Sequence, residues 1–405
     1  MTDLFWPGDE RAGDVLSDAA LLAAMVDVEA AWLDALVAAG IAPPEAKADL
    51  PGLVGAADVP GIAAAAEAGG NPVIPLVALL RERVGADTEA ARWLHRALTS
   101  QDVVDTALVL GIRAAAQAVR RDLADQIEAL AALVATHRDT PMVARTLTQH
   151  AVPTTFGLKA AQWLGAVLDA ADAVTGLDFP AQVGGAAGTM AAASELAGVD
   201  GARRLAADTA DRLGLADAPP WHTTRTTMTR AGDAAVAATD AWGRIANDVL
   251  TLGRPEIGEL AEGTGGGSST MPHKANPVLA TLIRRAALTT PQLAATLHLA
   301  AAGSVDERAD GAWHAGWATL RTLLRRTRVA GSQTADLLAG LRVHPDRMRA
   351  TLDAARDDVL AEQRSMAALT AADAAPDTQP HYLGAAGPLV DAVLHRARAQ
   401  LEETP

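Results

Sequence analysis

Residues 263–277 combine a run of glycines with hydroxyls, a lysine and an asparagine. The segment reads Gly-Thr-Gly-Gly-Gly-Ser-Ser-Thr-Met-Pro-His-Lys-Ala-Asn-Pro and precedes an expected helix. A flexible linker is the simplest alternative, but a linker has no need of Met-Pro-His-Lys-x-Asn-Pro. A phosphate-binding loop would end in Gly-Lys-Ser/Thr, which is missing here. A glycine arm that carries Ser268 and Ser269, with Lys274 and Asn276 behind them, is typical of a lid over an active site.

A second polar segment, residues 98–106, opens another expected helix and reads Leu-Thr-Ser-Gln-Asp-Val-Val-Asp-Thr. Thr99 with Asp102 three residues later is an acceptable helix N-cap, so capping alone is the structural alternative. A helix N-terminus also binds anions, because its first N–H groups have no partner within the helix. Capping and anion binding therefore need not compete at this position.

A third polar segment, residues 145–157, reads Arg-Thr-Leu-Thr-Gln-His-Ala-Val-Pro-Thr-Thr-Phe-Gly and lies just ahead of a long helix. Its histidine, His150, has a side chain that gains or loses charge near neutral pH and so suits proton transfer. A lone histidine near a helix start is more often a surface or capping residue. The residues alone leave both interpretations open.

Five long segments with apolar residues at helical spacing must position these three clusters. They occupy residues 102–135, 155–174, 231–252, 277–299 and 311–338. Helices of this length with wide alanine and leucine faces bury one face against their own chain and another against a partner subunit. With no strand alternation recognised, the pattern predicts an all-α fold built around a bundle of long helices.

Breaks in the helical pattern divide the chain into three expected domains. Residues 1–92 form an irregular N-terminal helical domain, in which Ser17 caps a helix that ends near Gly40. Residues 93–340 form the central long-helix bundle, and residues 341–405 form a C-terminal helical cap with a loop at 373–380.

The composition excludes several classes of function. The formal charge of −15 argues against a nucleic-acid partner, because phosphate binding needs a basic face. No apolar run reaches the roughly 18–20 residues that span a bilayer, and acidic residues stand where a signal peptide is basic, so we expect a cytoplasmic protein with no membrane contact. The chain has no cysteine, so disulfides, thiolate nucleophiles and cysteine zinc sites are absent.

The glycine-rich segment resembles the signature of the fumarase/aspartase superfamily, Gly-Ser-Ser-x-x-Pro-x-Lys-x-Asn, which matches residues 267–276. The resemblance implies that Ser268 is the general base, that His150 transfers a proton on the opposite face of the substrate, and that Thr-Ser-x-Asp at 99–102 holds a carboxylate. It implies a cofactor-free and metal-free reaction at a carbon beside a carboxylate. The substrate-binding residues expected from the three signature segments and the segment ending at residue 225 are Thr99, Ser100, Gln101, Arg145, Thr146, Arg225, Ser269, Lys274 and Asn276.

Further segments at 182–189, 220–225, 306–314 and 381–386 resemble the muconate cycloisomerase branch of that superfamily. This resemblance implies an isomerase that closes 3-carboxy-cis,cis-muconate to 4-carboxymuconolactone in the protocatechuate branch of the β-ketoadipate pathway. Two positions depart from the branch: Ala275 stands where arginine is usual, and Asp306 where histidine is usual. Leu147 replaces a histidine that adenylosuccinate lyases usually carry.

The resemblance also implies a homotetramer in which three subunits contribute the three signature segments to each active site. The substrate would be a small polycarboxylate. Two alternatives remain open: an adenylosuccinate lyase-like β-elimination enzyme, and a catalytically silent helical oligomer. The presence of Ser268, Lys274, Asn276 and His150 together argues against the silent oligomer.

Overall fold

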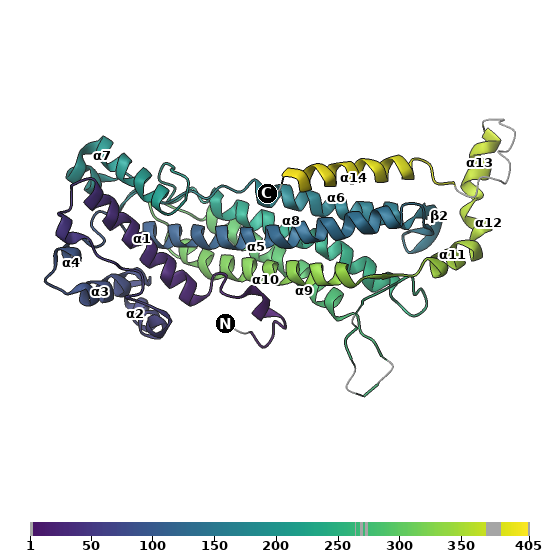
Figure 1. Cartoon of the computed structure of the whole chain (residues 1–405), viewed down its shortest axis with the longest axis horizontal. Coiled ribbons are helices and arrows are strands. Elements are labelled where there is room, and N and C mark those ends of the chain that lie inside the picture. Colours follow the sequence, from purple (N-terminus) through teal and green to yellow (C-terminus); the bar gives the residue numbers. More distant parts are fainter. Residues whose placement is uncertain (1–2, 264, 268–269, 272–273, 370–381, 404–405) are drawn as a thin grey trace. The chain divides into compact units, whose positions relative to one another are not determined.

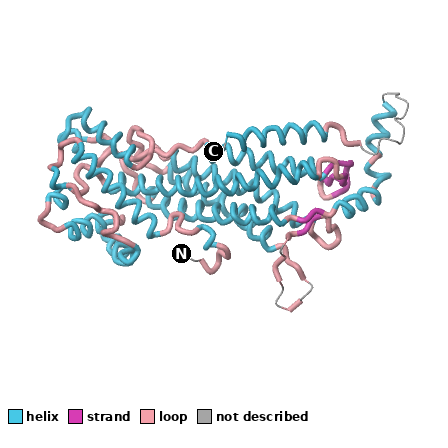
Figure 2. Tube along the Cα trace, in the orientation of Figure 1, coloured by secondary structure: helices cyan, strands magenta, loops and turns pink. Residues whose placement is uncertain are grey.

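The structure is a computed structural model that describes residues 3–263, 265–267, 270–271, 274–369 and 382–403. Helices form most of the described chain, and the strands are few and short (Figure 1, Figure 2). The expected all-α class is therefore confirmed. The loop expected at 373–380 lies outside the described residues.

The chain forms two compact units, each made of several segments. The first contains residues 1–118, 176–235 and 290–329, and the second contains residues 119–175, 236–289 and 330–405. The division into three domains at residues 92 and 340 stays a prediction, because it follows breaks in the helical pattern rather than compactness.

The elements of the first unit are η1 (Asp9–Ala12), α1 (Asp18–Ala38), η2 (Pro44–Ala46), η3 (Ala56–Asp58), α2 (Val59–Gly69), α3 (Val73–Val84), α4 (Glu89–Trp93) and α7 (Ala191–Arg212). Four long helices have residues in both units: α5 (Ser100–Thr136), α8 (Thr226–Leu252), α9 (Val278–Ala302) and α10 (Ala312–Gly340). The second unit also holds β1 (Pro141–Thr146), β2 (Gln149–Thr155), α6 (Phe156–Thr175), β3 (Leu260–Ala261), β4 (Arg342–Val343), α11 (Pro345–Ala354), α12 (Arg356–Val359), α13 (Ala361–Leu369) and α14 (Ala386–Glu403).

The predicted helix boundaries agree with the structure to within a few residues. Ser17 is the N-cap of α1, and its hydroxyl accepts a hydrogen bond from the Ala20 N–H at 3.1 Å. The largest difference is at α8, which begins at Thr226, five residues before the expected start at 231. Two threonines and a methionine open this helix, so the alanine pattern that predicted it begins one turn late.

Small residues let the helices of the second unit approach closely. A Cβ added to Gly243 of α8 would lie 2.5 Å from Ala287 of α9, a distance at which one helix must shift. The indole N–H of Trp242 donates to the Gln126 side chain at 2.7 Å, and the amide of Gln126 donates to the Gly331 carbonyl at 2.9 Å. All polar groups that this buried contact brings together are thus paired, as a close-packed core requires.

An antiparallel hairpin of β1 and β2 was not expected from the sequence. Thr146 pairs with Gln149, so Leu147 and Thr148 form a two-residue turn in which both have positive φ, 48° and 71°. Such turns usually carry Asn-Gly or Asp-Gly, because other side chains are strained there by roughly 1–2 kcal/mol per residue. The hairpin signal was therefore missing from the sequence.

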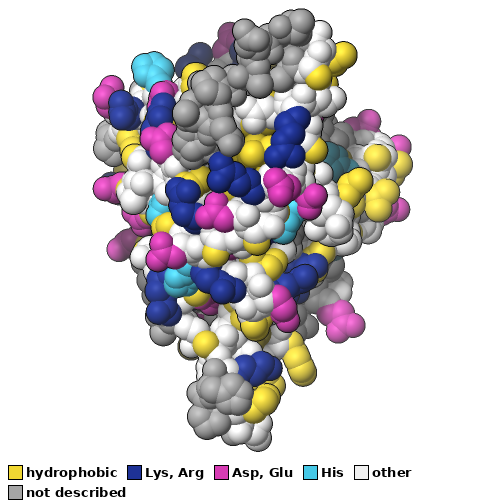
Figure 3. All heavy atoms as spheres, turned by 90° about the vertical axis from the view of Figure 1, so that its right-hand side faces the viewer, with side chains coloured by type: hydrophobic (Ala, Val, Ile, Leu, Met, Phe, Trp, Pro, Cys, Tyr) yellow, Lys and Arg dark blue, Asp and Glu magenta, His cyan; other side chains and the backbone are white. Residues whose placement is uncertain are grey.

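No helix of the described residues is long and apolar enough to cross a membrane. On the face shown in Figure 3, basic and acidic side chains are interspersed over the part that is coloured. The coloured part of this face therefore shows no single-sign patch of the kind that binds a polyanion.

Candidate active site

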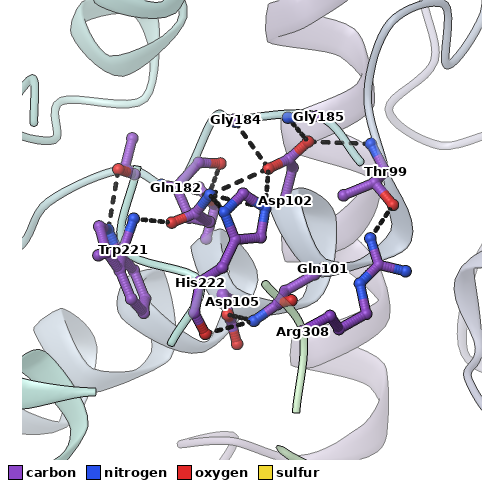
Figure 4. Close-up of polar contacts among 12 residues, drawn as sticks. Thr99, Gln101, Asp102, Asp105, Gln182, Gly184, Gly185, Trp221, His222 and Arg308 are labelled. Carbon is purple, nitrogen blue, oxygen red and sulfur yellow. Dashed lines mark hydrogen bonds and ion pairs between the residues drawn. The ribbon is translucent and has the colours of Figure 1, made fainter. Parts of the chain in front are cut away.

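Asp102 organises the backbone at the N-terminus of α5 in the first unit (Figure 4). The side chain is fully buried, and one oxygen accepts from the N–H groups of Thr99 and Gly185 at 2.9 and 3.0 Å. The other oxygen accepts from the Gly184 N–H at 2.9 Å and from the Gln182 amide at 3.1 Å. Asp102 thereby holds the helix start against the glycine loop at 184–185.

Gln182 and His222 complete this buried network. The Gln182 side-chain oxygen accepts the Trp221 N–H at 2.7 Å, and its amide nitrogen lies 3.3 Å from both ring nitrogens of His222. A Cβ on Gly184 would come within 2.4 Å of the His222 ring, so only glycine fits at this position. The glycine loop at 184–185 and the His222 ring are consequently in close packing contact.

Asp105, one turn further along α5, holds Arg225. Its two oxygens accept from the guanidinium at 2.5 and 3.0 Å, from the Trp313 indole at 3.0 Å and from the Gln101 amide at 3.0 Å. Asp105 is fully buried, and only 9% of the Arg225 side chain is exposed. The structure thus places Arg225, an expected substrate ligand, in a bidentate ion pair within its own unit.

The orientation of the Gln101 side chain is determined by its neighbours. Its amide nitrogen donates to Asp105 at 3.0 Å and to the His222 carbonyl at 2.8 Å. Turning the amide over would face its oxygen toward a carboxylate and a carbonyl, and both are acceptors only. The buried Gln101 oxygen has no hydrogen-bond partner among the residues that the structure describes. Gln101 therefore has no N–H left for a substrate carboxylate.

Thr99 and Ser100 form the start of α5. Ser100 is the first residue of the helix, and the Thr99 hydroxyl bonds the guanidinium of Arg308. The Thr99 hydroxyl thus faces a cation. Of the two side-chain hydrogen bonds in the expected capping arrangement, the one from the Thr99 N–H to the Asp102 carboxylate is present. A helix N-terminus with an exposed arginine beside it is suited to an anion.

A small cavity of about 20 Å³ lies beside this network and is lined by residues that include His222, Arg225, Trp313 and Trp317. That volume has room for about one water molecule. Within the described part of the chain, the buried indole N–H of Trp317 has no hydrogen-bond partner, so a water in this cavity could accept a hydrogen bond from it.

The remaining predicted site residues that the structure describes lie in the second unit. His150 and Thr146 belong to the β1–β2 hairpin and are exposed. Arg145 lies opposite His150 in the hairpin register, and its guanidinium donates to both oxygens of Glu259 at 2.7 and 3.0 Å. Glu259 is fully buried. Arg145 is therefore held by a carboxylate of its own unit, as Arg225 is in the other.

The base of the glycine arm is closed by an antiparallel bridge between Gly266 and Asn276. Both backbone hydrogen bonds of this bridge are 2.8 Å long, and the Asn276 amide also donates to the Gly267 carbonyl at 3.3 Å. Lys274 is exposed on the arm. Ser268 and Ser269, the expected base and its neighbour, lie outside the described residues.

Glu262 connects this arm to α9. Its carboxylate accepts from the N–H groups of Leu279 and Ala280 at 3.2 and 2.7 Å, which caps the helix N-terminus. Burial raises the pKa of Glu262, and the hydrogen bonds from the helix oppose that change. The carboxylate thus fixes where the arm ends and the helix begins.

The sequence pointed to Asp102 as part of the Thr-Ser-x-Asp motif, but it gave no site role to Asp105, Gln182, His222 or Trp313. The available signal was the spacing of Gln101, Asp102 and Asp105, because polar residues three and four apart share one face of a helix. An apolar long helix with such a polar face has to pair it internally. Among the residues that the structure describes, no group of three or more His, Asp or Glu side chains is arranged to hold a metal ion.

Residues 61–290 of the chain match the lyase family. A nitrosuccinate lyase of Streptomyces davaonensis is 46% identical over 363 residues, which cover 86% of this chain and 76% of that protein. A 3-carboxy-cis,cis-muconate cycloisomerase of Bradyrhizobium diazoefficiens is 42% identical over 354 residues, 85% of this chain and 77% of the relative. The crystal structure of a 3-carboxy-cis,cis-muconate lactonizing enzyme from Pseudomonas putida superimposes with a TM-score of 0.88 at 30% identity, covering 98% of this chain and 99% of that one.

Proposed function

Because the chain belongs to the lyase family, within the fumarase/aspartase superfamily, we propose that it is a 3-carboxy-cis,cis-muconate cycloisomerase. The observation that carries the proposal is the likeness to the lactonizing enzyme from Pseudomonas putida over nearly the full length of both chains. The cycloisomerase relative from Bradyrhizobium diazoefficiens, at 42% identity, supports the same substrate.

The proposed reaction closes a lactone within one molecule. A carboxylate of the substrate adds to the carbon that bears another carboxylate, so a C–O bond forms and a C=C bond is lost. The neighbouring carbon takes a proton from Ser268, the residue that removes this proton in the reverse direction. His150 orients the attacking carboxylate or balances its charge. Charge that develops on the carboxylate beside the reacting carbon needs donors in fixed positions, and this is the largest expected contribution to catalysis.

Several carboxylate-binding groups support a polyanionic substrate. Thr99 and Ser100 at the start of α5 lie beside Arg308, and this N-terminus provides N–H groups together with a cation. Lys274 and Asn276 on the glycine arm are the other proposed carboxylate ligands. Such local contacts act at about 3 Å, so they outweigh the net charge of −15, most of which is screened beyond about 10 Å.

We further propose that the enzyme is a cytoplasmic homotetramer with active sites shared among three subunits. The hairpin supports this proposal, because His150 is exposed and Leu147 at the turn is 95% exposed. A histidine that orients a substrate carboxylate or balances its charge works best where water is excluded, and an exposed leucine at a strained turn is suited to burial by another copy. Light scattering of the purified protein tests the assembly, and an active monomer would contradict it.

A second candidate is elimination from nitrosuccinate. The 46% identity to a nitrosuccinate lyase favours it, and Ala275 removes a positive charge that the cycloisomerase branch usually carries beside Asn276. Nitrosuccinate is also a polycarboxylate, and loss of its nitro group beside a carboxylate uses the same base and the same charge stabilisation.

Parallel assays of the purified protein without added cofactor separate these functions. Loss of diene absorbance from 3-carboxy-cis,cis-muconate is expected, with neither nitrite release from nitrosuccinate nor turnover of adenylosuccinate at a comparable kcat/KM. Nitrite release alone would replace the proposal by the second candidate. Turnover of adenylosuccinate alone would establish the lyase alternative, and inactivity with all three would favour a silent oligomer.

A further inference from the structure

Both carboxylate oxygens and both backbone polar groups of Glu259 form hydrogen bonds within the second unit. Its two carboxylate oxygens accept from Arg145 at 2.7 and 3.0 Å, its N–H donates to Leu252 at 2.9 Å, and its carbonyl accepts from the His344 N–H at 3.0 Å. The side chain is fully buried, and only 16% of the Arg145 side chain is exposed. Separating this pair would leave a carboxylate charge buried without a partner, which proteins strongly disfavour.

Arg145 also belongs to the strand segment that faces His150. The two residues are register partners across the hairpin, just after an irregularity between Val143 and Arg145. Residues directly opposite in an antiparallel pair have their side chains on the same face, about 5 Å apart at Cβ. The guanidinium that binds Glu259 therefore comes from the residue adjacent to the imidazole.

The hairpin needs such an anchor near its tip. Val143 at the base packs with Leu352, Ala355 and Val359 of the following helices, so this end is fixed by apolar contacts. The tip has a strained turn, and its Leu147 side chain is 95% exposed. Arg145 lies between base and tip, and its ion pair with Glu259 attaches this region to another part of the chain.

Glu259 continues directly into the segment that carries the glycine arm. Leu260 and Ala261 form β3, which pairs with β4, and Glu262 then caps α9. The Arg342 guanidinium donates to the carbonyls of Glu262 and Gly263 at 3.0 and 2.8 Å. A displacement of Glu259 would therefore also displace residues 260–263, which lead into the glycine arm.

We propose that the Glu259–Arg145 ion pair is a positioning device that couples the His150 hairpin to the base of the glycine arm, and that Arg145 acts through this pair rather than as a substrate ligand. The inference rests on the proposed function for its kinetic consequences. It assigns Glu259 and Arg145 as positioning residues. It also replaces the carboxylate-binding role expected for Arg145 from the signature segment.

The variants Glu259→Gln and Arg145→Lys distinguish a positioning role for Arg145 from a role as a direct substrate ligand. Glutamine keeps the shape of Glu259 but loses the charge, and lysine keeps the charge of Arg145 but loses the bidentate geometry. Misplacement of a catalytic group by about 1 Å lowers rate by up to about 100-fold, so we expect kcat to fall at least about tenfold in each variant while KM changes less than about threefold. Asp9→Asn, which breaks the buried Arg325–Asp9 pair in the first unit, is the matched control and should leave the ratio of kcat to KM unchanged.

A direct ligand role for Arg145 makes the opposite prediction. Glu259→Gln would then release the guanidinium toward substrate, so kcat would stay at the wild-type value and KM would be unchanged or lower, while Arg145→Lys would raise KM. Either result overturns the proposal.

Hydrogen exchange followed by mass spectrometry provides a readout without substrate. In Glu259→Gln, amides of residues 141–155 and of residues 260–267 should exchange faster together, whereas those of α6 should not. Faster exchange in only one of the two segments would contradict the coupling. If the wild-type enzyme turned over none of the proposed substrates, the function would fail while this measurement still decided the coupling.

Discussion

Asp105 binds both terminal nitrogens of Arg225, at 2.5 and 3.0 Å, and this pair lies at the centre of the polar network of α5. The carboxylate also accepts from Gln101 and Trp313, so one side chain connects α5 with the segment before α8 and with α10. A buried carboxylate with four donors is stable only while its partners remain charged and in place.

We predict that Asp105→Asn lowers the free energy of unfolding by about 3–5 kcal/mol, because it leaves the Arg225 charge buried without a counterion. Urea denaturation measures this change. Arg230→Ala is the control, since Arg230 and Asp178 are 4.0 Å apart with 63% and 81% of their side chains exposed. The control should change stability by less than about 1 kcal/mol. Equal effects in the two variants would contradict the importance assigned to the buried pair.

Asp102→Asn is predicted to weaken substrate binding more than turnover. Asn has an N–H₂ group in place of one carboxylate oxygen, so either Thr99 and Gly185 or Gly184 and Gln182 would face a donor and must move. Loss of a hydrogen bond to a charged group costs about 1.5–3 kcal/mol, which corresponds to a rise in KM of about tenfold or more for 3-carboxy-cis,cis-muconate. Steady-state kinetics on folded protein check this, and an unchanged KM would exclude the α5 N-terminus as a carboxylate site.

The base of the glycine arm is predicted to be intolerant of a side chain at Gly263. A Cβ there would lie 2.4 Å from the Gly340 carbonyl oxygen, which belongs to the backbone and cannot rotate away. Gly263→Ala should lower the free energy of unfolding by about 1–3 kcal/mol. In Gly165→Ala of α6, where nothing lies within 4 Å, we expect a gain of about 0.5–1 kcal/mol instead. If the free energy of unfolding rose in both variants, the close approach of Gly263 to the Gly340 carbonyl would not be formed.

His137 should make stability depend on pH. Burial lowers its pKa below the ordinary 6.5, and its ring lies edge-on to Phe156 just beyond the end of α5. The unfolded chain then binds the proton more readily than the folded protein, so this stability is present above pH 6.5 and is lost as the pH falls below 6.5 through the lower pKa of the folded state. Urea denaturation between pH 7.5 and 5.5 should show a smaller loss for His137→Gln than for the wild type. An equal or larger loss in the variant would contradict the shift.

The long helices were predictable because their apolar spacing continues over many turns and Ser17 marks one start. The hairpin at 141–155 was not, because Leu147 and Thr148 occupy turn positions where the backbone prefers glycine or asparagine. Only the surrounding structure can impose such a conformation.

The candidate site likewise has some features that the sequence indicated and others that only the tertiary structure shows. The signature segments pointed to Thr99, Arg145, His150, Lys274 and Asn276 as chemically unusual positions. The sequence could not show that Asp105 and Glu259 neutralise the two arginines expected to bind substrate, because these partners are 120 and 114 residues away along the chain. Pairing over such separations is a property of the tertiary fold.

The most direct test of the proposed function is proton NMR of 3-carboxy-cis,cis-muconate incubated with the purified enzyme in D₂O, beside a Ser268→Ala variant. We predict that the wild type forms 4-carboxymuconolactone with one deuterium on the carbon next to the new C–O bond. The variant should remain folded but at least about 100-fold slower, as expected when a proton-transfer group is removed. An unchanged substrate spectrum with the wild type, or full activity in Ser268→Ala, would contradict it.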